Sequence, residues 1–361
     1  MFTFKYKHRK LFHYTIKKAR VKDHDGRRHT LIIVQLAGGL GNQMQQYALY
    51  RKFMSLGVEA KLDASWFDSA AQRNVYAKRT LELSYFKELP MEFCTADEKK
   101  RLTGGTGMAA KLSRKLGIIN TKEFTETGMY HDDLLSKKDC YIKGYFACEK
   151  YYADILPELR KLYVFPEAVD KTAGEKNEEF AREVASDKET GVTPVSIHIR
   201  RGDYLDPENA ALLGGICTQE YYDGAVSVVR TAVGAAGKAA PTAKAASEAN
   251  RSAAAKFHFY IFSDDAEYVQ KLHFGEQNEQ NTVVYWNNGR DSLLDMKLMS
   301  LCSANIVANS TFSFWGARLN PAQNKVMVRP SVHKNTQVYD PAQMHELWQN
   351  WILVDPKGRQ V

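Results

Sequence analysis

Short apolar runs alternate with longer amphipathic stretches over most of this chain. Residues 31–36 form an apolar run of the kind found in buried strands. A glycine-rich turn at 37–43 follows it, and the apolar positions at 44–56 have helical spacing. A second run at 58–62 ends at Asp63. This order predicts an opening β-α-β unit with parallel strands.

The second half of the chain repeats this alternation from residue 195 onward. In the run at 195–199 every other position is apolar, so the opposite face of the predicted strand carries Ser196, His198 and Arg200. Residues 64–130 predict a mixture of helices and loops. The pattern predicts further strands at 141–146, 257–262, 282–285, 306–308 and 326–328, and helices at 149–162, 169–186, 218–229, 292–302 and 310–319. We therefore expect an α/β fold of two doubly wound domains that face a cleft.

The predicted organisation has four parts. A basic arm occupies residues 1–30, the first α/β domain 31–190 and the second 191–335, and a tail at 336–361 packs back on the fold. Residues 231–256 are rich in alanine with Gly, Lys and Ser, so we expect a low-complexity surface insertion without chemistry.

The net charge of +8 belongs to the arm and not to the fold. Residues 1–30 hold ten of the 50 basic and two of the 42 acidic residues, so the remainder of the chain is balanced. A balanced fold argues against a nucleic-acid partner. Aromatic residues lie between the basic ones, so contact with an anionic membrane surface is one hypothesis. A solvated tail is the alternative.

The five cysteines are scattered and odd in number, which favours free thiols in a reducing compartment. No apolar stretch has the length of a membrane span, and we find no secretory signal. We expect a cytoplasmic protein, with the arm in peripheral contact with the inner face of the membrane if the membrane hypothesis holds.

The candidate chemistry centres on Arg200 and Arg201, which end the strand at 195–199 ahead of a turn at Gly202 and Asp203. Ligands of open α/β sheets bind at the carboxyl ends of the strands, and the planar guanidinium matches phosphate oxygens. The pattern predicts a site for an anionic, phosphorylated ligand. A solvated pair of surface charges is the alternative.

Two other strand ends carry polar side chains. Ser310 and Thr311 precede a predicted helix, where free N–H groups and the helix dipole favour an anion. Asp264 follows the strand at 257–262 and could meet ribose hydroxyls or a guanine edge. Simple helix capping is the alternative for all three residues.

The glycine-rich turn can be interpreted in two ways. Gly39, Gly41 and Asp63 have the spacing of a dinucleotide-binding fingerprint, although Met44 stands where a small residue is expected. Asn42 in the same turn could contact a sugar. Asp23-His24-Asp25 lies in the arm, and no cluster with metal-ligand spacing occurs elsewhere in the sequence.

Five blocks, taken together and in this order, resemble the α-1,2-fucosyltransferases of glycosyltransferase family 11. The blocks span roughly residues 31–330, whereas the arm and the insertion match none of them. Ala147 and Cys148 depart from the polar pair expected after the second block, so we assign no site there. The blocks are Gly38-Gly39-Leu40-Gly41-Asn42-Gln43-Met44-x-Gln46-Tyr47, Gly144-Tyr145-Phe146, His198-x-Arg200-Arg201-Gly202-Asp203-Tyr204, Phe262-Ser263-Asp264-Asp265 and Ala308-Asn309-Ser310-Thr311-Phe312-Ser313-Phe314-Trp315-Gly316-Ala317-x-Leu319-Asn320.

The resemblance implies a GT-B-like fold, with the acceptor on the first domain and GDP-fucose on the second. It implies an inverting, metal-independent transfer of fucose to the 2-hydroxyl of a terminal galactose on a glycan. Within it, Arg200 holds the β-phosphate, and His198, Arg201 and Asp203 support that loop. Ser310 and Thr311 add phosphate contacts, Asp264 faces the nucleoside, and Asn42 lies near the sugar. Arg200, Asp203 and His198 are the expected catalytic residues. Asp203 is a candidate general base, or it only holds Arg200 in place.

Three other functions stay open at this level. A transferase could use another nucleotide sugar. An NAD-dependent oxidoreductase could be built on Gly39, Gly41 and Asp63, which leaves Arg200 and Ser310 unexplained. A non-catalytic glycan-binding protein would bind the acceptor without releasing GDP.

Overall fold

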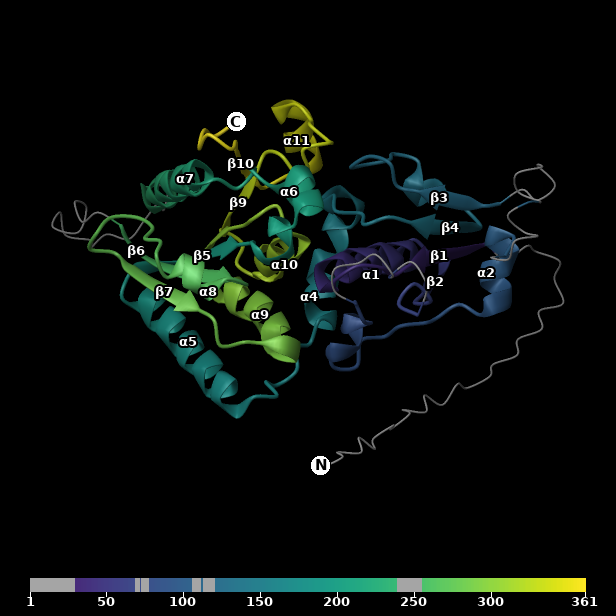
Figure 1. The fold of residues 1–361 in the computed structure, drawn as a ribbon, viewed down its shortest axis with the longest axis horizontal. Coiled ribbons are helices and arrows are strands. Elements are labelled where there is room, and N and C mark those ends of the chain that lie inside the picture. Colours follow the sequence, from purple (N-terminus) through teal and green to yellow (C-terminus); the bar gives the residue numbers. More distant parts are fainter. Residues whose placement is uncertain (1–29, 69–71, 73–77, 106–111, 113–120, 239–254) are drawn as a thin grey trace.

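The computed structural model describes residues 30–68, 72, 78–105, 112, 121–238 and 255–361. They form two sheets in which every pair of neighbouring strands is parallel, one sheet in each half of the chain. In Figure 1 the sheet of the first half lies on the right and that of the second half on the left. The basic arm at 1–29 and most of the alanine-rich insertion lie outside the described residues.

The first sheet has the strand order β2-β1-β4-β3. Helix α1 (Leu40–Ser55) covers one face and shares a core with Ile32 and Val34, while α2 (Ala96–Thr103) packs on the other face beside Leu31 and Ile33. Both faces are thus covered, as the uninterrupted apolar run predicted. The strands are β1 (Leu31–Gln35), β2 (Glu59–Asp63), β3 (Glu123–Thr125) and β4 (Cys140–Lys143).

The second sheet has the order β10-β9-β8-β5-β6-β7. Helix α7 (Gln219–Lys238) packs on one face, and α5 (Lys171–Glu189), α9 (Leu294–Leu301) and α10 (Thr311–Leu319) cover the other. The strands are β5 (Val192–Ile199), β6 (Lys256–Ser263), β7 (Gln280–Val284), β8 (Ala304–Ile306), β9 (Val326–Pro330) and β10 (Ile352–Val354). The predicted α/β architecture of two doubly wound units is confirmed.

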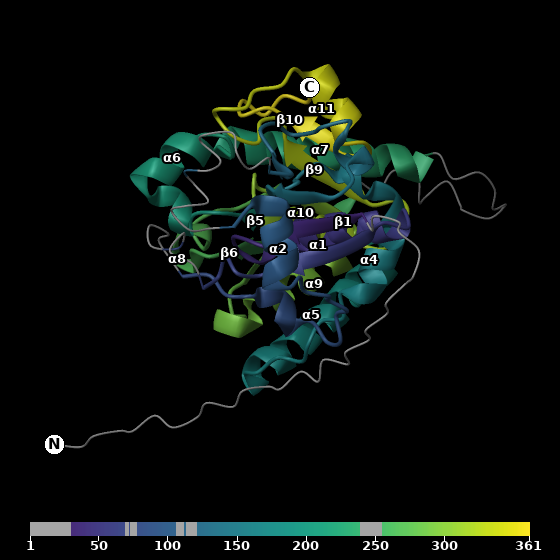
Figure 2. The same cartoon turned by 90° about the vertical axis from the view of Figure 1, so that its right-hand side faces the viewer.

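The strand order reverses at β1/β4 in the first sheet and at β5/β8 in the second. Crevices in open α/β sheets lie outside the carboxyl ends of the strands at such reversals. Helix α1 follows β1, and α10 follows β8. These two helices lie side by side between the sheets in both views (Figures 1 and 2). The two reversal points therefore face each other.

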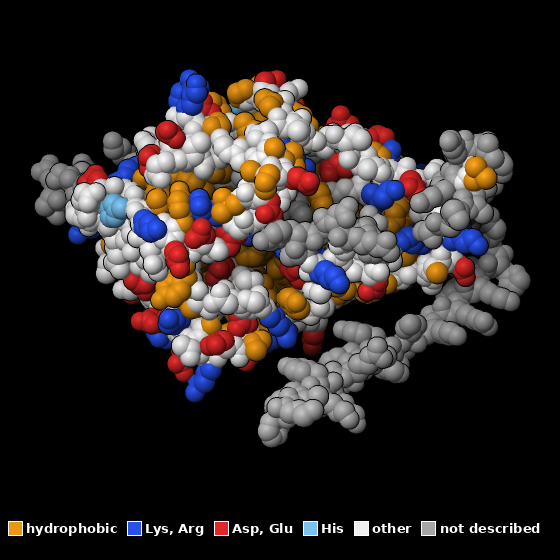
Figure 3. Space-filling view, in the orientation of Figure 1, with side chains coloured by type: hydrophobic (Ala, Val, Ile, Leu, Met, Phe, Trp, Pro, Cys, Tyr) orange, Lys and Arg blue, Asp and Glu red, His pale blue; other side chains and the backbone are white. Residues whose placement is uncertain are grey.

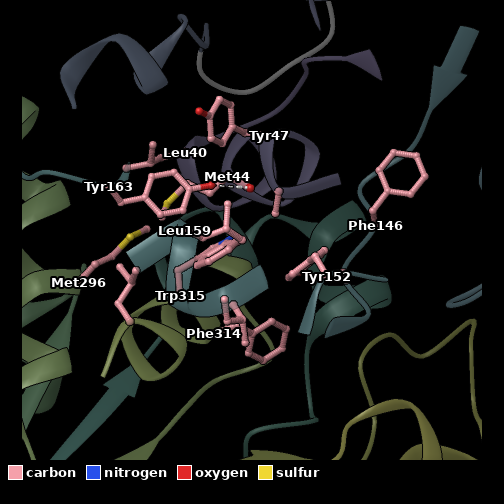
Figure 4. Packing of buried hydrophobic residues seen from close by; sticks show 14 of the residues in the cluster. Leu40, Met44, Tyr47, Phe146, Tyr152, Leu159, Tyr163, Met296, Phe314 and Trp315 are labelled. Atoms are coloured by element: carbon pink, nitrogen blue, oxygen red, sulfur yellow. Dashed lines mark hydrogen bonds between the residues drawn. The ribbon is translucent and has the colours of Figure 1, made fainter. Parts of the chain in front are cut away.

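One hydrophobic cluster runs through both halves. Trp315 of α10 is fully buried beside Met44 of α1, and its ring lies 5.3 Å from that of Tyr163 (Figure 4). The Tyr163 hydroxyl donates to the carbonyl oxygen of Met44 at 2.9 Å. The halves are thus joined through shared core and not only through a linker.

Three predicted elements differ from those observed. Helix α1 begins at Leu40, four residues before the predicted start, because extended Gly39 is its N-cap and Glu82 accepts the Leu40 N–H. The predicted helix at 149–162 is two short 3-10 turns followed by α4 (Leu156–Leu162). The predicted strand at 141–146 ends at Lys143, because the chain turns through positive φ at Gly144 and Phe146.

The C-terminal segment forms part of the second sheet. After α11 (Pro341–Leu347), β10 pairs with β9, so the chain ends next to this sheet edge (Figure 2). Trp348 and Trp351 of this segment are both buried. Among the described residues, no helix has the length and apolar character needed to cross a membrane.

Candidate active site

A cavity of about 1550 Å³ opens between the two halves. Its wall includes the carboxyl ends of β1 and β4 from the first sheet and of β5 and β6 from the second, together with the start of α10. Of the candidate residues, the cavity is lined by Asn42, His198, Arg200, Asp203, Asp264, Ser310 and Thr311. Residues far apart in the sequence therefore meet at one cavity. On the face shown in Figure 3, basic and acidic side chains are interspersed.

Arg200 is held from two sides by carboxylates. Its Nε and Nη2 donate to Asp203 Oδ1 at 3.1 and 2.6 Å, and its Nη1 lies 2.7 Å from Asp264 Oδ2. Burial lowers the pKa of Arg200, but the two carboxylates outweigh burial and raise it above the usual value. Guanidinium has five N–H donors, so N–H groups on both Nη atoms stay available to a ligand. The arrangement presents a fixed, permanently charged fork.

Asp203 and Asp264, which hold Arg200, each make one further contact. Asp203 also lies 3.5 Å from Arg79 Nη2, which reaches it from the first half. Asp264 accepts the backbone N–H of Arg201 at 2.9 Å through its other oxygen. Asp264 therefore lies in the cavity as predicted but is bound to the arginine loop.

Arg201 points away from the cavity. Its Nε donates to Asp265 at 2.9 Å, and its guanidinium lies 3.6 Å from the centre of the Tyr268 ring. The chain turns at Arg201 (φ −127°, ψ −78°), which sends the two neighbouring arginines in different directions. A role for Arg201 in donor binding stays a prediction, and these contacts lend it no support.

His198 is 6 % exposed and lies against the Phe312 ring, 5.7 Å between ring centres. Burial, reinforced by nearby Arg200, lowers the pKa of His198 to about 3. The imidazole is therefore neutral near pH 7, and Nδ1 is buried without a partner among the described residues. A neutral imidazole suits a positioning or hydrogen-bonding role beside Arg200 better than that of a cation.

Polar residues at 309–313 have two roles: some bind the backbone, and some line the cavity. Asn309 and Ser313 bind backbone carbonyl groups, whereas the cavity is lined by Asn309, Ser310 and Thr311. Ser310 is the N-cap residue of α10, but its side chain makes no capping hydrogen bond. Its hydroxyl and the free N–H groups of the first turn therefore stay available to an anion.

The glycine-rich turn brings the two helix starts together. A Cβ on Gly41 would lie 2.6 Å from the backbone nitrogen of Phe312, so only glycine fits there. Gly38 has φ +79°, and a Cβ there would lie 2.7 Å from Asn42 Nδ2. Asn42, next to this turn, lines the cavity.

Asp63, the acid of the dinucleotide interpretation, lies outside this cavity. It accepts the Tyr141 hydroxyl and lies 2.7 Å from Lys99 Nζ. Burial raises its pKa, but bonds from Lys99 and Tyr141 outweigh burial and hold the pKa below the usual value. Asp63 thus has partners within the fold, which argues against the oxidoreductase alternative.

Sequence reasoning missed several cavity residues, among them three carboxyl groups. Burial raises the pKa of Glu126 and of Asp295 to about 7 each, and it raises the pKa of Glu82. Tyr145 lies in a predicted block, but no role was assigned to it. None of the three carboxyl groups lies in a recognisable motif. Among the described residues, no group of three or more His, Cys, Asp or Glu is arranged to hold a metal ion.

Comparison with known proteins identifies a matching family model and two similar bacterial proteins. A family model described as glycosyl transferase family 11 matches residues 243–354. The chain is 27% identical over 316 residues to the O-antigen biosynthesis glycosyltransferase WbnK of Escherichia coli, covering 82% of this chain and 92% of the relative. It is 26% identical over 304 residues to an α-1,2-colitosyltransferase of Escherichia coli, covering 84% and 92%.

Similar solved structures include the fucosyltransferase NodZ from Bradyrhizobium, with 13% identity, a TM-score of 0.38 and coverage of 80% of this chain and 92% of that one. A variant of Arabidopsis thaliana FUT1 in complex with GDP has 14% identity and a TM-score of 0.39, with coverage of 84% and 73%. At these TM-scores the assignment depends on the sequence relatives, the family model and the predicted blocks. They confirm the predicted resemblance, and the chain is similar to members of glycosyltransferase family 11.

Proposed function

We propose that this glycosyltransferase transfers L-fucose from GDP-β-L-fucose to the 2-hydroxyl of a terminal galactose on a glycan, with inversion and without a metal. The observation that carries the proposal is the fork of Arg200, held by Asp203 and Asp264 at the cavity wall. A leaving diphosphate needs such a preorganised cation.

The residues have distinct parts in this reaction. Negative charge develops on the β-phosphate as the bond to the sugar breaks, and Arg200 stabilises it through its Nη donors. The start of α10 adds N–H dipoles and the hydroxyls of Ser310 and Thr311. Asp203 and Asp264 keep the guanidinium in position. Asn42, across the cavity, would contact the fucose or the acceptor.

The linkage and the sugar have separate support. A relative named an α-1,2-colitosyltransferase supports transfer to a 2-hydroxyl, and its name supports colitose as a second candidate sugar. The other relative, named for O-antigen biosynthesis, supports a glycan as the acceptor. The proposed arm contact with anionic membrane is a separate hypothesis.

The test is a donor panel. Purified protein is incubated with GDP-fucose, GDP-colitose and other nucleotide sugars, each with a β-galactoside, and products are read by mass spectrometry. We expect a deoxyhexose mass increase with GDP-fucose that persists in EDTA, and NMR should place an α-linked fucose at O2. Transfer from another donor alone, or from none, would overturn the proposal.

A further inference from the structure

Direct displacement with inversion requires that the acceptor hydroxyl lose a proton on the side of the sugar opposite the phosphate. Asp203, the candidate base from the sequence, is poorly suited to accept it. Its Oδ1 takes two hydrogen bonds from Arg200, and its Oδ2 faces Arg79. Asp264 is likewise bound to Arg200 and to the backbone of Arg201. Both lie on the half that carries the phosphate-binding groups.

Glu126 lies on the opposite half of the cavity, just after β3. Its Oε2 accepts the backbone N–H groups of Tyr145 and Phe146 at 2.8 and 2.9 Å, and its own N–H donates to the carbonyl of Lys143. A Cβ on Gly144 would lie 2.5 Å from the Cβ of Glu126. The turn after β4 is thus shaped around this carboxyl group.

The second carboxylate oxygen has no such support. Oε1 is buried and has no hydrogen-bond partner among the described residues. An unpaired buried carboxylate oxygen is costly, so a proton or a donor from a ligand would relieve it. Glu126 lines the cavity, so a small rotation of its carboxyl group would turn Oε1 toward an acceptor hydroxyl bound there.

The surroundings of Glu126 favour proton uptake near neutral pH. Burial raises its pKa to about 7, although the two backbone N–H groups and Lys334 oppose this. Tyr151 and Tyr152, in the turns after β4, interact with Glu126 electrostatically, and the pKa of each hydroxyl group is raised well above its usual value, mainly by burial. Lys334, which follows β9, is the cation that acts on it. A base with a pKa close to the working pH is the most effective kind.

Two other cavity carboxyl groups are less suitable. Glu82 accepts the Leu40 N–H at 3.0 Å and so caps the start of α1. Asp295 lies on α9 in the half that carries Arg200, where Asn287 donates to it at 2.8 Å. Glu82 is thus committed to the first turn of α1, with Arg79 opposing the rise of its pKa, and Asp295 lies on the half that carries the phosphate-binding groups.

We propose that Glu126, which lines the cavity, is the general base of the transfer and accepts the proton of the attacking acceptor hydroxyl. This role rests on the proposed transfer reaction. An oxygen lone pair of the acceptor forms the new bond to C1 of the sugar as the bond from C1 to the β-phosphate oxygen breaks. The electron pair of the broken bond leaves with GDP. The acceptor proton passes to Glu126, which later releases it to water.

The experiment compares Glu126→Gln with Glu123→Gln, a control from the same strand whose carboxylate pairs with Lys143 at 2.6 Å. Glutamine keeps an oxygen for the N–H groups of Tyr145 and Phe146 but removes the base. We expect Glu126→Gln to lower kcat about 10²–10⁴-fold with GDP affinity unchanged. Glu123→Gln should keep wild-type kcat.

Azide separates a base from a structural group, because it is an anionic nucleophile with no proton to lose. With azide in place of the galactoside, Glu126→Gln should form the glycosyl azide at the wild-type rate. An equal loss with azide, or normal transfer by Glu126→Gln while the wild type is active, would overturn the base role alone. Absence of transfer by the wild type would overturn the proposed function and this role together.

The pH profile of the wild type is a readout that needs no variant to fold. kcat/KM should fall below about pH 7 as Glu126 becomes protonated, and this limb should vanish in Glu126→Gln. A profile without that limb, or a limb removed by Glu82→Gln instead, would overturn the proposal.

Discussion

Trp315 donates its indole N–H to the backbone carbonyl oxygen of Gly41 at 3.1 Å. This hydrogen bond joins α10 of the second half to α1 of the first at the point where both helices begin next to the cavity. The contact is close because Gly41 has no side chain to hold the backbone of Thr311 and Phe312 away. The positions of Asn42 on one helix and Thr311 on the other therefore depend on it.

Gly41→Ala should separate these helix starts. The added Cβ would lie 2.6 Å from backbone atoms that cannot rotate away, so we expect a loss of stability of about 1–3 kcal/mol and at least a tenfold loss of transfer. Thermal unfolding measures the loss of stability, and kcat measures the loss of transfer. Gly234→Ala in α7 is the control, since nothing lies within 4 Å of its added Cβ, and it should leave both values near wild type. Equal behaviour of the two variants would contradict the tight contact.

Arg200→Lys should lower kcat more than tenfold and weaken GDP binding. Lysine retains a charge but loses the fork that Asp203 orients. Arg201→Lys is the matched comparison, because that arginine pairs with Asp265 outside the cavity. Isothermal titration with GDP and steady-state kinetics should show a much smaller effect there. A larger effect at Arg201 would restore it to the phosphate site.

Asp295→Asn should stabilise the protein at high pH. Burial raises the pKa of Asp295 from an ordinary value of 3.8 to about 7, so its ionisation costs stability as the pH rises through that window. Asparagine removes that cost while it can still accept from Asn287. We expect no gain near pH 4 and a gain of about 1–3 kcal/mol at pH 8. Urea unfolding of both proteins at pH 4 and pH 8 measures this gain in the free energy of unfolding. A gain that is the same at both pH values would contradict a raised pKa of Asp295.

The basic arm offers a test independent of the cavity. If its basic and aromatic residues rest on anionic lipid, the full chain should float with vesicles rich in phosphatidylserine, and removal of residues 1–28 should abolish flotation. Neutral phosphatidylcholine vesicles are the control. Equal flotation of the two forms would favour the solvated tail.

The sequence located Arg200 well because its strand has a strict alternation. With Ile197 and Ile199 buried on one face, His198 and Arg200 had to share the other, and the structure places both at the cavity. The same pattern could not separate Arg200 from Arg201. The direction of Arg201 depends on a turn and on Asp265 and Tyr268, which lie more than 60 residues away in the sequence.

Glu126 could not be predicted, since its surroundings are made by tertiary structure. Its oxygen meets the N–H groups of Tyr145 and Phe146 only because β3 and β4 pair in one register and Gly144 permits close approach. The early start of α1 was missed for a similar reason, because the carboxylate that caps it comes from Glu82. Periodicity reports burial well, but it does not report which distant polar group completes a site.

The shared core around Trp315 and Met44 has a consequence for how the molecule melts. Because this apolar cluster includes Ile32 near the beginning and Leu353 near the end of the described chain, neither half can lose its packing without exposing the other. Calorimetry should then record one cooperative transition instead of two. A nucleotide held by the second half alone would raise the melting temperature of the first half as well, so that GDP protects strands that it never touches.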